Sequence, residues 1–214
     1  MAQRTLTITE KEYIRTRLIK GALFYKKYLL DKLFLIVTDD YQIETVTFTE
    51  HDFPHLTGIK SNIRNCDFLD YCSSGKLKRA NINSNQRHNV NHLLGKANLI
   101  ENIQRFLHAD TNANLFLMGV TTNTTTFPCA IRNDNLQITI LFKGSNRHAR
   151  SARKEATPPK HYYSKRIIGV FEMHDNRADK IIYIKNGKQI VNNIHNSHDL
   201  FSQRLLSKLS NDNN

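Results

Sequence analysis

The sequence predicts an α+β fold in which N-terminal helices pack on an antiparallel β-sheet. Two observations support this class. Segments with helical spacing of apolar residues dominate the first half of the chain, and short β-branched runs follow one another in the second half. Consecutive strands without intervening helices favour an antiparallel sheet. Because no repeat or linker divides the chain, residues 1–186 are expected to form one domain, followed by a polar tail over residues 187–214.

The first half is predicted to hold three helices and one hairpin. Thr9 and Glu12 have the spacing of a capping box, so they are expected to begin the first helix. The hairpin turn is the DDY sequence between two β-branched runs, and the polar stretch 76–91 predicts a loop. The elements are expected at residues 9–30 (helix), 34–38 and 42–48 (hairpin strands), and 61–74 and 92–109 (helices).

The second half is predicted to be rich in strands. An Asn-Asp-Asn turn and an Asp-Asn-Arg turn each separate two of the runs, as expected for hairpins. A basic segment over residues 144–166 interrupts the series, and a weak helical pattern lies near residues 200–209. The strands are expected at residues 115–120, 126–132, 136–143, 166–174 and 180–185.

Composition excludes some classes of protein. The net charge of +12 and pI of about 9.7 favour a polyanionic partner, of which nucleic acid is the commonest. No apolar run approaches the roughly 18 residues of a transmembrane helix, and the N-terminus lacks the apolar core of a secretion signal. The three cysteines form no CxxC motif, which favours reduced thiols in a cytoplasmic protein. Because no apolar run is long enough to span a bilayer, no membrane partner is expected.

The basic segment is the strongest sequence signal for nucleic-acid binding. Between Lys143 and Arg166 lie eight Lys or Arg residues and one acid, Glu155, with tyrosines interleaved. Arginine contacts phosphate in a bidentate manner and tyrosine stacks on unpaired bases, although a solvated loop without a partner is the alternative. The nucleic-acid-binding candidates are Lys60, Arg147, His148, Arg150, Arg153, Lys154 and Lys165.

The sequence favours no metal or nucleotide cofactor. Acidic residues are scattered and form no paired motif on a strand, so a two-metal nuclease is not expected. The pairs His51/His55 and His88/His92 are four apart, but HExxH is absent and Pro54 interrupts the first pair. There is also no P-loop and no GxGxxG motif.

RNA can be cut without a metal ion because its 2′-hydroxyl is an internal nucleophile. The protein must accept the proton of that hydroxyl, protonate the leaving 5′-oxygen and neutralise the charged phosphorane. Histidine suits the proton steps, and Lys and Arg suit the charge. The segment FTEHDFPHLTGIK at residues 48–60 brings such residue types together and is expected to form one wall of an active site.

These residues also carry a resemblance to a known family. The pattern F-x-H-L-T-G-[IL] at residues 53–59, Lys96 in GKANLIENI, and Phe142-Lys143 at the end of a late strand are similar to the phage and mobile-element nucleases of the barnase–EndoU–colicin–RelE (BECR) superfamily. The resemblance spans roughly residues 33–185. It implies a compact BECR-like fold that cuts RNA without metal, often as a toxin.

By this resemblance, His55 and Thr57 are candidate catalytic residues, followed by Lys96 and Lys143. The family tends to place a Tyr and a Ser around a Pro in the late segment, which here corresponds to Tyr163 and Ser164 after Pro158-Pro159, within a longer and more basic stretch. The implied partners are RNA, with tRNA as one candidate, and a cognate antitoxin or immunity protein.

Other interpretations remain open from the residues alone. His55 and Thr57 can have structural roles beside a turn, Lys96 can extend from a packed helix, and Tyr163 can be a core strand residue. The chain is then a non-catalytic nucleic-acid-binding or regulatory protein that uses residues 143–166. A protein-binding module, such as a phage inhibitor of a host enzyme, is the third class.

Overall fold

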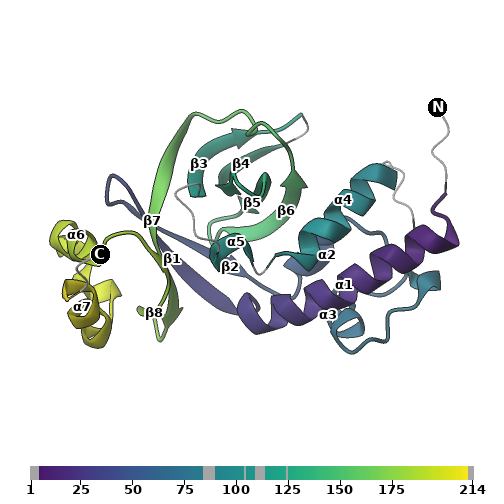
Figure 1. Ribbon diagram of the computed structural model, residues 1–214, viewed down its shortest axis with the longest axis horizontal. Helices are drawn as coiled ribbons and strands as arrows, with labels where there is room; N and C mark the ends of the chain where they lie inside the picture. The colour runs from purple at the N-terminus through teal and green to yellow at the C-terminus, as the bar shows by residue number, and fades with distance from the viewer. Residues whose placement is uncertain (1–4, 84–89, 104, 109–113, 124, 212–214) are drawn as a thin grey trace.

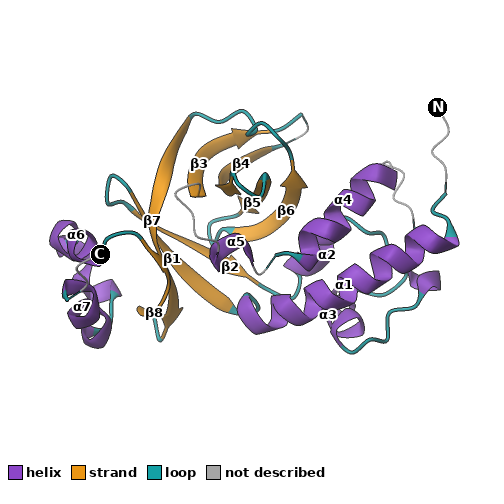
Figure 2. Cartoon of the chain, viewed as in Figure 1, coloured by secondary structure: helices purple, strands orange, loops and turns teal. Residues whose placement is uncertain are grey.

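The structure is a computed structural model that describes residues 5–83, 90–103, 105–108, 114–123 and 125–211. Figure 1 shows three parts in a row: a group of helices that includes the N-terminal helix, a β-barrel in the middle, and the C-terminal helices at the other end. The α+β class is therefore confirmed. Figure 2 shows that the strands are concentrated in the middle part.

The sheet is a closed seven-stranded barrel rather than an open antiparallel sheet. Strands are hydrogen-bonded in the order β1-β2-β6-β5-β4-β3-β7, and pairing of β1 with β7 closes the ring, while β8 pairs only with β7. The expected antiparallel sheet is therefore present in large part, but it closes into a ring by joining distant segments such as Leu33 and Met173, which local sequence patterns do not reveal. The strands are β1 (Lys32–Thr38), β2 (Ile43–Phe48), β3 (Asn114–Thr121), β4 (Thr126–Asn133), β5 (Ile138–Lys143), β6 (His148–Lys154), β7 (Tyr163–His174) and β8 (Arg177–Ile184).

One junction of the barrel differs from the others. All neighbouring strands are antiparallel except β2 and β6, which run parallel and share a single bridge, between Thr47 and His148. Beyond this bridge the chain of β2 ends and turns into helix α2 (Asp52–Thr57), which packs on β6. A helix therefore takes the place of a strand along part of β6.

The basic segment forms part of the barrel instead of a surface loop. Residues 148–154 are strand β6, and β7 already begins at Tyr163. Ala149 and Ala152 point into the barrel, whereas Arg150 and Lys154 are exposed. Small alanines are sufficient on the inner side of a narrow barrel, so β6 lacks the large apolar residues by which a strand is usually identified.

The N-terminal half folds largely as expected, with shifted boundaries. Helix α1 begins at a capping box formed by Thr7 and Glu10, one of two sites with the same spacing. The helix expected at residues 92–109 is divided into two, with Gln104 and Ala109 outside the described residues. The helices are α1 (Ile8–Tyr28), α2 (Asp52–Thr57), α3 (Asn65–Ser73), η1 (Arg79–Asn81), α4 (Val90–Glu101) and α5 (Arg105–His108).

One hydrophobic core joins the barrel to these helices. The ring of Phe48 makes edge-to-face contacts with Phe34 and Phe142 of the barrel, at centroid distances of 5.9 and 5.7 Å. It also contacts Tyr25 of α1 at 6.2 Å. Such aromatic pairs add to the hydrophobic gain of burial. Because Phe48 ends β2, this core fixes where the chain enters α2.

The segment after Asn186 was expected to be polar with a weak helical pattern near residues 200–209, and it forms helices that pack on the sheet. Phe201, Leu205 and Leu209 follow one another at intervals of four residues, so they share one face. They are buried with Leu35 and Phe171 on the outer side of the sheet. Polar residues between them conceal this apolar face in the sequence. The elements are α6 (Gly187–Asn193), η2 (His195–Leu200) and α7 (Gln203–Ser210), and residues 212–214 lie outside the described part of the chain.

The cysteines form no disulfide: Cys66 is exposed, and Cys72 and Cys129 are buried. Burial raises the pKa of both buried thiols to about 12, which makes them poor nucleophiles. Within the described residues, none of the helices combines the length and the apolar character needed to cross a bilayer.

Two helical glycines test how tightly α1 packs on α4. A Cβ at Gly21 of α1 would lie 2.4 Å from Cγ2 and 2.6 Å from the carbonyl oxygen of Ile100, whereas a Cβ at Gly95 of α4 meets nothing within 4 Å. We expect Gly21→Ala to lower the free energy of unfolding by about 1–3 kcal/mol. The control Gly95→Ala should raise it by up to about 1 kcal/mol through helix propensity. Urea denaturation measures both, and a Gly21→Ala protein as stable as the wild type would contradict the packing.

Candidate active site

Helix α2 positions the candidate residues of the HLTG motif against strand β6. Phe53 and Leu56 are buried in the core and hold the helix in place. Pro54 lies in the first turn, where a missing N–H is tolerated, so it does not prevent the helix. The helix ends at Gly58, whose φ of +64° is a left-handed conformation suited to glycine. His55 therefore lies on a short, well-fixed helix.

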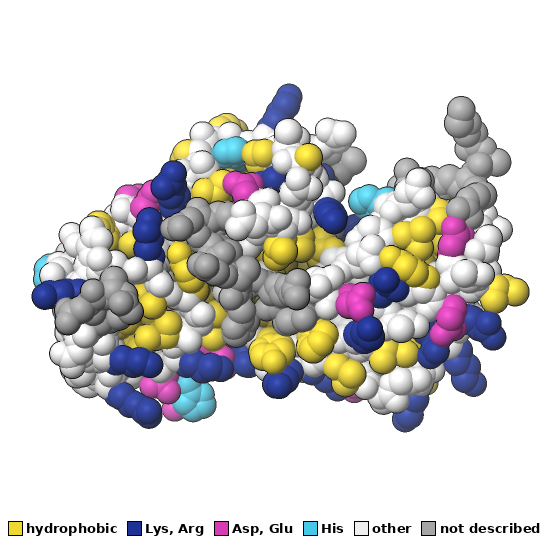
Figure 3. Space-filling model, viewed as in Figure 1, with side chains coloured by type: hydrophobic (Ala, Val, Ile, Leu, Met, Phe, Trp, Pro, Cys, Tyr) yellow, Lys and Arg dark blue, Asp and Glu magenta, His cyan; other side chains and the backbone are white. Residues whose placement is uncertain are grey.

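A cavity of about 500 Å³ lies where α2, α4 and β6 meet. It brings together several of the sequence-predicted residues, and Figure 3 shows His side chains on the helix side and Lys or Arg side chains on the barrel side of the notch between these parts. The lining residues are Pro54, His55, Gly58, Ile59, His92, Lys96, Ser151, Arg153, Lys154 and Glu155.

Lys96 is the most unusual group of the cavity. Its side chain is only 6% exposed, and it forms no ion pair with a carboxylate of the described residues. Burial, and then the nearby charge of Arg153, lower the pKa of Lys96 to about 8. A Cβ at Gly58 would lie 2.8 Å from Cδ and 3.1 Å from Nζ of Lys96, so the absent side chain of Gly58 makes room for the ammonium group.

His55 is half-buried at the edge of the same cavity. Burial lowers the pKa of His55, and the positive charges of Arg150 and Lys96 lower it further, while Asp52 acts in the opposite direction. The imidazole is therefore neutral at pH 7, because its usual pKa of about 6.5 is already below that pH. A neutral imidazole can accept a proton.

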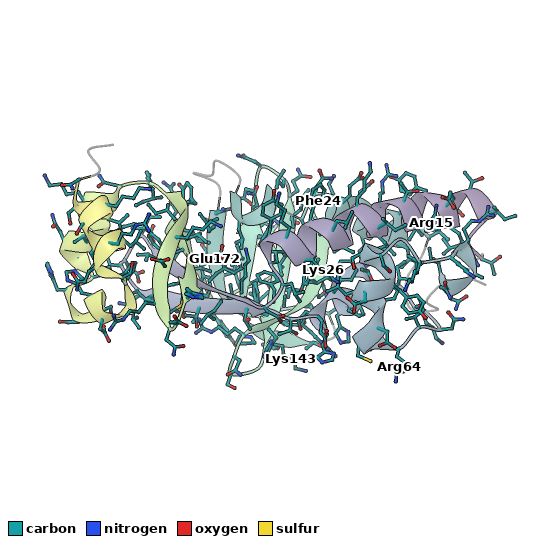
Figure 4. All side chains as sticks on the ribbon, turned by 90° about the horizontal axis from the view of Figure 1, so that it is seen from below. Arg15, Phe24, Lys26, Arg64, Lys143 and Glu172 are labelled. Atoms are coloured by element: carbon teal, nitrogen blue, oxygen red, sulfur yellow. The ribbon has the colours of Figure 1, made fainter. Side chains whose placement is uncertain are left out.

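A second hollow, of about 470 Å³, lies near the start of β6. It is lined by Thr49, His51, Asp52, Lys143, Gly144, His148 and Arg150. Figure 4 shows Lys143 at the edge of the molecule away from α1. Arg150 links the two hollows, because it lines this one and its charge acts on His55 in the other.

Asp52 is a residue that sequence reasoning did not select. It is 5% exposed, and its Oδ2 accepts hydrogen bonds from the backbone N–H and hydroxyl of Thr49 at 2.7 and 3.0 Å. Its Oδ2 also lies 3.8 Å from Nδ1 of His148, and burial raises its pKa. The T-x-x-D spacing of Thr49 and Asp52 was the available signal. Ser151, a hydroxyl residue of the basic segment, also lines the cavity, as does His92, which was not in the predicted site.

Thr57 does not line the cavity. It is fully buried, its hydroxyl donates to the carbonyl oxygen of Pro54 at 2.8 Å, and it accepts from the N–H of Ile59 at 3.2 Å. The hydroxyl thus stabilises the end of α2. Lys60 is exposed just after Ile59, with its carbonyl bonded to Asn83.

The structure does not bring Tyr163 and Ser164 to His55. They begin β7, which is separated from β6 by two strands in one direction around the barrel and by three in the other. Two of the predicted nucleic-acid-binding cations are held by carboxylates instead. Lys165 lies 2.5 Å from Asp40, and Arg147 is paired with Glu44.

A metal site is not evident in the described part of the chain, where no three His, Cys, Asp or Glu side chains cluster. His51 is exposed near Glu50 at 3.6 Å, and His92 lies at the cavity. His88 lies outside the described residues.

The burial of Lys96 has a consequence for stability. In the unfolded chain its pKa is about 10.5, so below pH 8 the folded state carries an unfavourable buried charge. This cost disappears as pH rises from 8 to 10.5, because Lys96 loses its proton at a lower pH in the folded protein than in the unfolded chain. We therefore expect Lys96→Met to raise the free energy of unfolding at pH 7 by about 3 kcal/mol.

Chemical denaturation at pH 7 and pH 10.5 measures this effect. The advantage of Lys96→Met over the wild type should shrink at the higher pH, and the exposed Lys76→Met variant controls for loss of charge. Equal stability of wild type and Lys96→Met at pH 7 would mean that the ammonium is not desolvated.

Comparison with known proteins gives one assignment. Residues 17–192 match the family model for phage-Barnase-EndoU-ColicinE5/D-RelE like nuclease 4. Neither the curated proteins nor the solved structures gave a significant match. The matched region contains α2, α4 and the entire barrel, and thus every wall of the cavity. The chain belongs to the phage-Barnase-EndoU-ColicinE5/D-RelE like nuclease 4 family, PBECR4.

Proposed function

We propose that the chain is a metal-independent endoribonuclease whose active site is the cavity between α2, α4 and β6. The observation that carries this proposal is Lys96, a buried ammonium group without a carboxylate partner among the described residues, beside Arg153 and a neutral His55. Burial of a charge is unfavourable unless it is paired. An anion is the missing partner, and in a nuclease the anion is a phosphodiester.

The three groups have the properties that RNA transesterification requires. His55, neutral at pH 7, is the base that accepts the proton of the 2′-hydroxyl. Lys96, protonated below its pKa of about 8, donates a proton to the leaving 5′-oxygen. Arg153 and Arg150 stabilise the charge that develops on the phosphorane, an effect that is strong where water is excluded.

The remaining cations extend the contact with the RNA backbone. Lys143 lines the second hollow, where Arg150 and the imidazole of His148 also lie, and Lys154 lines the first. Positive side chains in both hollows therefore face an RNA strand that crosses the cavity. Asp52, held by Thr49, lies 3.8 Å from Nδ1 of His148 in this arrangement.

The description of the family supports a proposal for the biological role. The model description names phage, colicin E5/D and RelE, which supports a toxin-like effector of a phage or mobile element that acts on cytoplasmic RNA. Transfer RNA is the first substrate to examine, and a cognate antitoxin or immunity protein is the expected protein partner.

A non-catalytic nucleic-acid-binding protein is the second candidate. The exposed cations Lys143, Arg150 and Lys154 favour it, since they can contact phosphates whether or not His55 acts on them. Binding would then weaken steeply with salt, without cleavage.

Incubation with tRNA or total RNA in EDTA tests the proposed activity. We expect products with 2′,3′-cyclic phosphate ends, because the 2′-hydroxyl is the nucleophile. The same sequences as DNA or 2′-O-methyl RNA should stay intact. His55→Ala should reduce the rate about 10²- to 10⁴-fold while retaining the fold, and His174→Ala, at an exposed site at the end of β7, is the control.

Intact RNA at high protein concentration would contradict the nuclease proposal, as would equal rates for His55→Ala and wild type. Salt-dependent binding without cleavage would then favour the second candidate.

The pH dependence tests the roles of the two proton-transfer groups. For the wild type, kcat/KM should rise through a pKa below 6.5 as His55 loses its proton and fall near pH 8 as Lys96 loses its own. Lys96→Arg keeps the charge but cannot release a proton, so we expect the fall near pH 8 to vanish and the rate to decrease about 10²-fold. Near-wild-type activity of Lys96→Arg would show that Lys96 acts by charge alone.

A further inference from the structure

Two neighbouring tyrosines are exposed on the barrel, away from the cavity. Tyr162 is 82% exposed and Tyr163 is 51% exposed. Within the described part of the chain, the other exposed large hydrophobic residues are Ile8, Leu23 and Tyr71, which are not adjacent to one another in the sequence. Aromatic side chains that are exposed to this degree are available to contact a partner.

The backbone that carries these rings is fixed. The N–H of Tyr162 donates to the carbonyl oxygen of Met118 at 3.0 Å, and the N–H of Thr121 donates to that of Lys160 at 2.8 Å. Gly119, with φ of +59°, allows the ring of Tyr162 to approach closely, since a Cβ there would lie 2.0 Å from the ring. The backbone of both tyrosines is therefore paired with β3, while their side chains remain exposed.

Basic residues flank the tyrosines in the sequence, and one of them lies near a ring. Lys160 and Arg166 are exposed on either side of the tyrosines in the sequence. Nζ of Lys165 lies 5.9 Å from the ring centroid of Tyr163, with Asp40 as its ion-pair partner. Aromatic faces next to cations are the combination that binds bases and phosphates of a single strand.

One row of paired strand residues runs around the barrel from the tyrosines to the second hollow. Tyr163 lies opposite Met118, which lies opposite Cys129, then Phe142 and finally Ala149, next to His148. Four inter-strand steps of about 4.8 Å give about 19 Å along the wall. An RNA strand of several nucleotides is long enough to span this distance from the tyrosines to the second hollow, which Arg150 relates to the cavity.

We infer that Tyr162 and Tyr163 form a stacking platform for unpaired bases of the RNA strand whose scissile phosphate lies in the cavity. The inference rests on the proposed function and names its substrate class, RNA with a single-stranded segment beside the cleaved bond. Stacking accepts every base, so the platform gives selectivity for unpaired over duplex RNA rather than for a sequence.

The test is equilibrium binding in a His55→Ala background, where RNA is not cut. We expect Tyr162→Ala/Tyr163→Ala to weaken binding of a single-stranded oligonucleotide about tenfold or more and to leave binding of the matching duplex nearly unchanged. The slope of affinity against salt should not change, because no cation is lost. Tyr162→Phe/Tyr163→Phe should bind as the parent does, and Tyr71→Ala on α3 is the control for an exposed tyrosine elsewhere.

A fluorescent probe makes the contact directly visible. The chain has no tryptophan, so Tyr162→Trp introduces a single one, whose emission should be quenched by single-stranded RNA and not by duplex. Unchanged affinity in the double alanine variant, equal losses for both RNA forms, or unquenched emission at saturation would each overturn the platform. These readouts do not depend on cleavage, so they separate its failure from failure of the nuclease proposal.

Discussion

The site depends on the incomplete seam between β2 and β6. One parallel bridge joins these strands, and the chain then leaves the barrel as α2. Beyond the bridge, α2 and α4 pack against β6, and α2 takes the place that a paired strand would occupy. Two hydrogen-bonded strands lie too close together to leave a cavity between them. Where helices pack against β6 instead, their side chains leave the cavity described above. Charged residues of β6 thus face a partly desolvated space, where electrostatic effects are stronger than on an open surface.

The pairing of each cation in the structure indicates its role. Arg132 is buried and bonded to Thr139, Asp134 and the carbonyl oxygens of residues 155 and 156, so it holds the end of β6 in place. Arg147 and Lys165 have carboxylate partners as well. Lys96 lacks one within the described chain, and the fold retains it at a cost in stability. Residues that reduce stability and have no structural partner are typical of functional sites.

Much of the fold could be predicted from local patterns. The first hairpin, strands β3 to β5 and the positions of α1, α3 and α4 follow from periodicity and turn residues, and the HLTG motif led to His55. Ring closure could not be predicted, because it pairs β1 with β7 across most of the chain. Strand β6 was missed because Ala149 and Ala152 are its inward residues. The role of Thr57 as a hydrogen-bonding partner at the helix end depends on a local geometry that the motif alone does not reveal.

The C-terminal helices affect the one strand that lies outside the ring. Strand β8 pairs with β7 on one side, and a free edge on its other side would offer unpaired N–H and C=O groups to any extended segment. Phe201 forms a parallel bridge with Ala178, and the N–H of Ser202 donates to the carbonyl oxygen of Ala178 at 2.9 Å. Residues 201–202 thus occupy this edge at Ala178, which leaves fewer unpaired backbone groups for strand addition by a neighbouring copy.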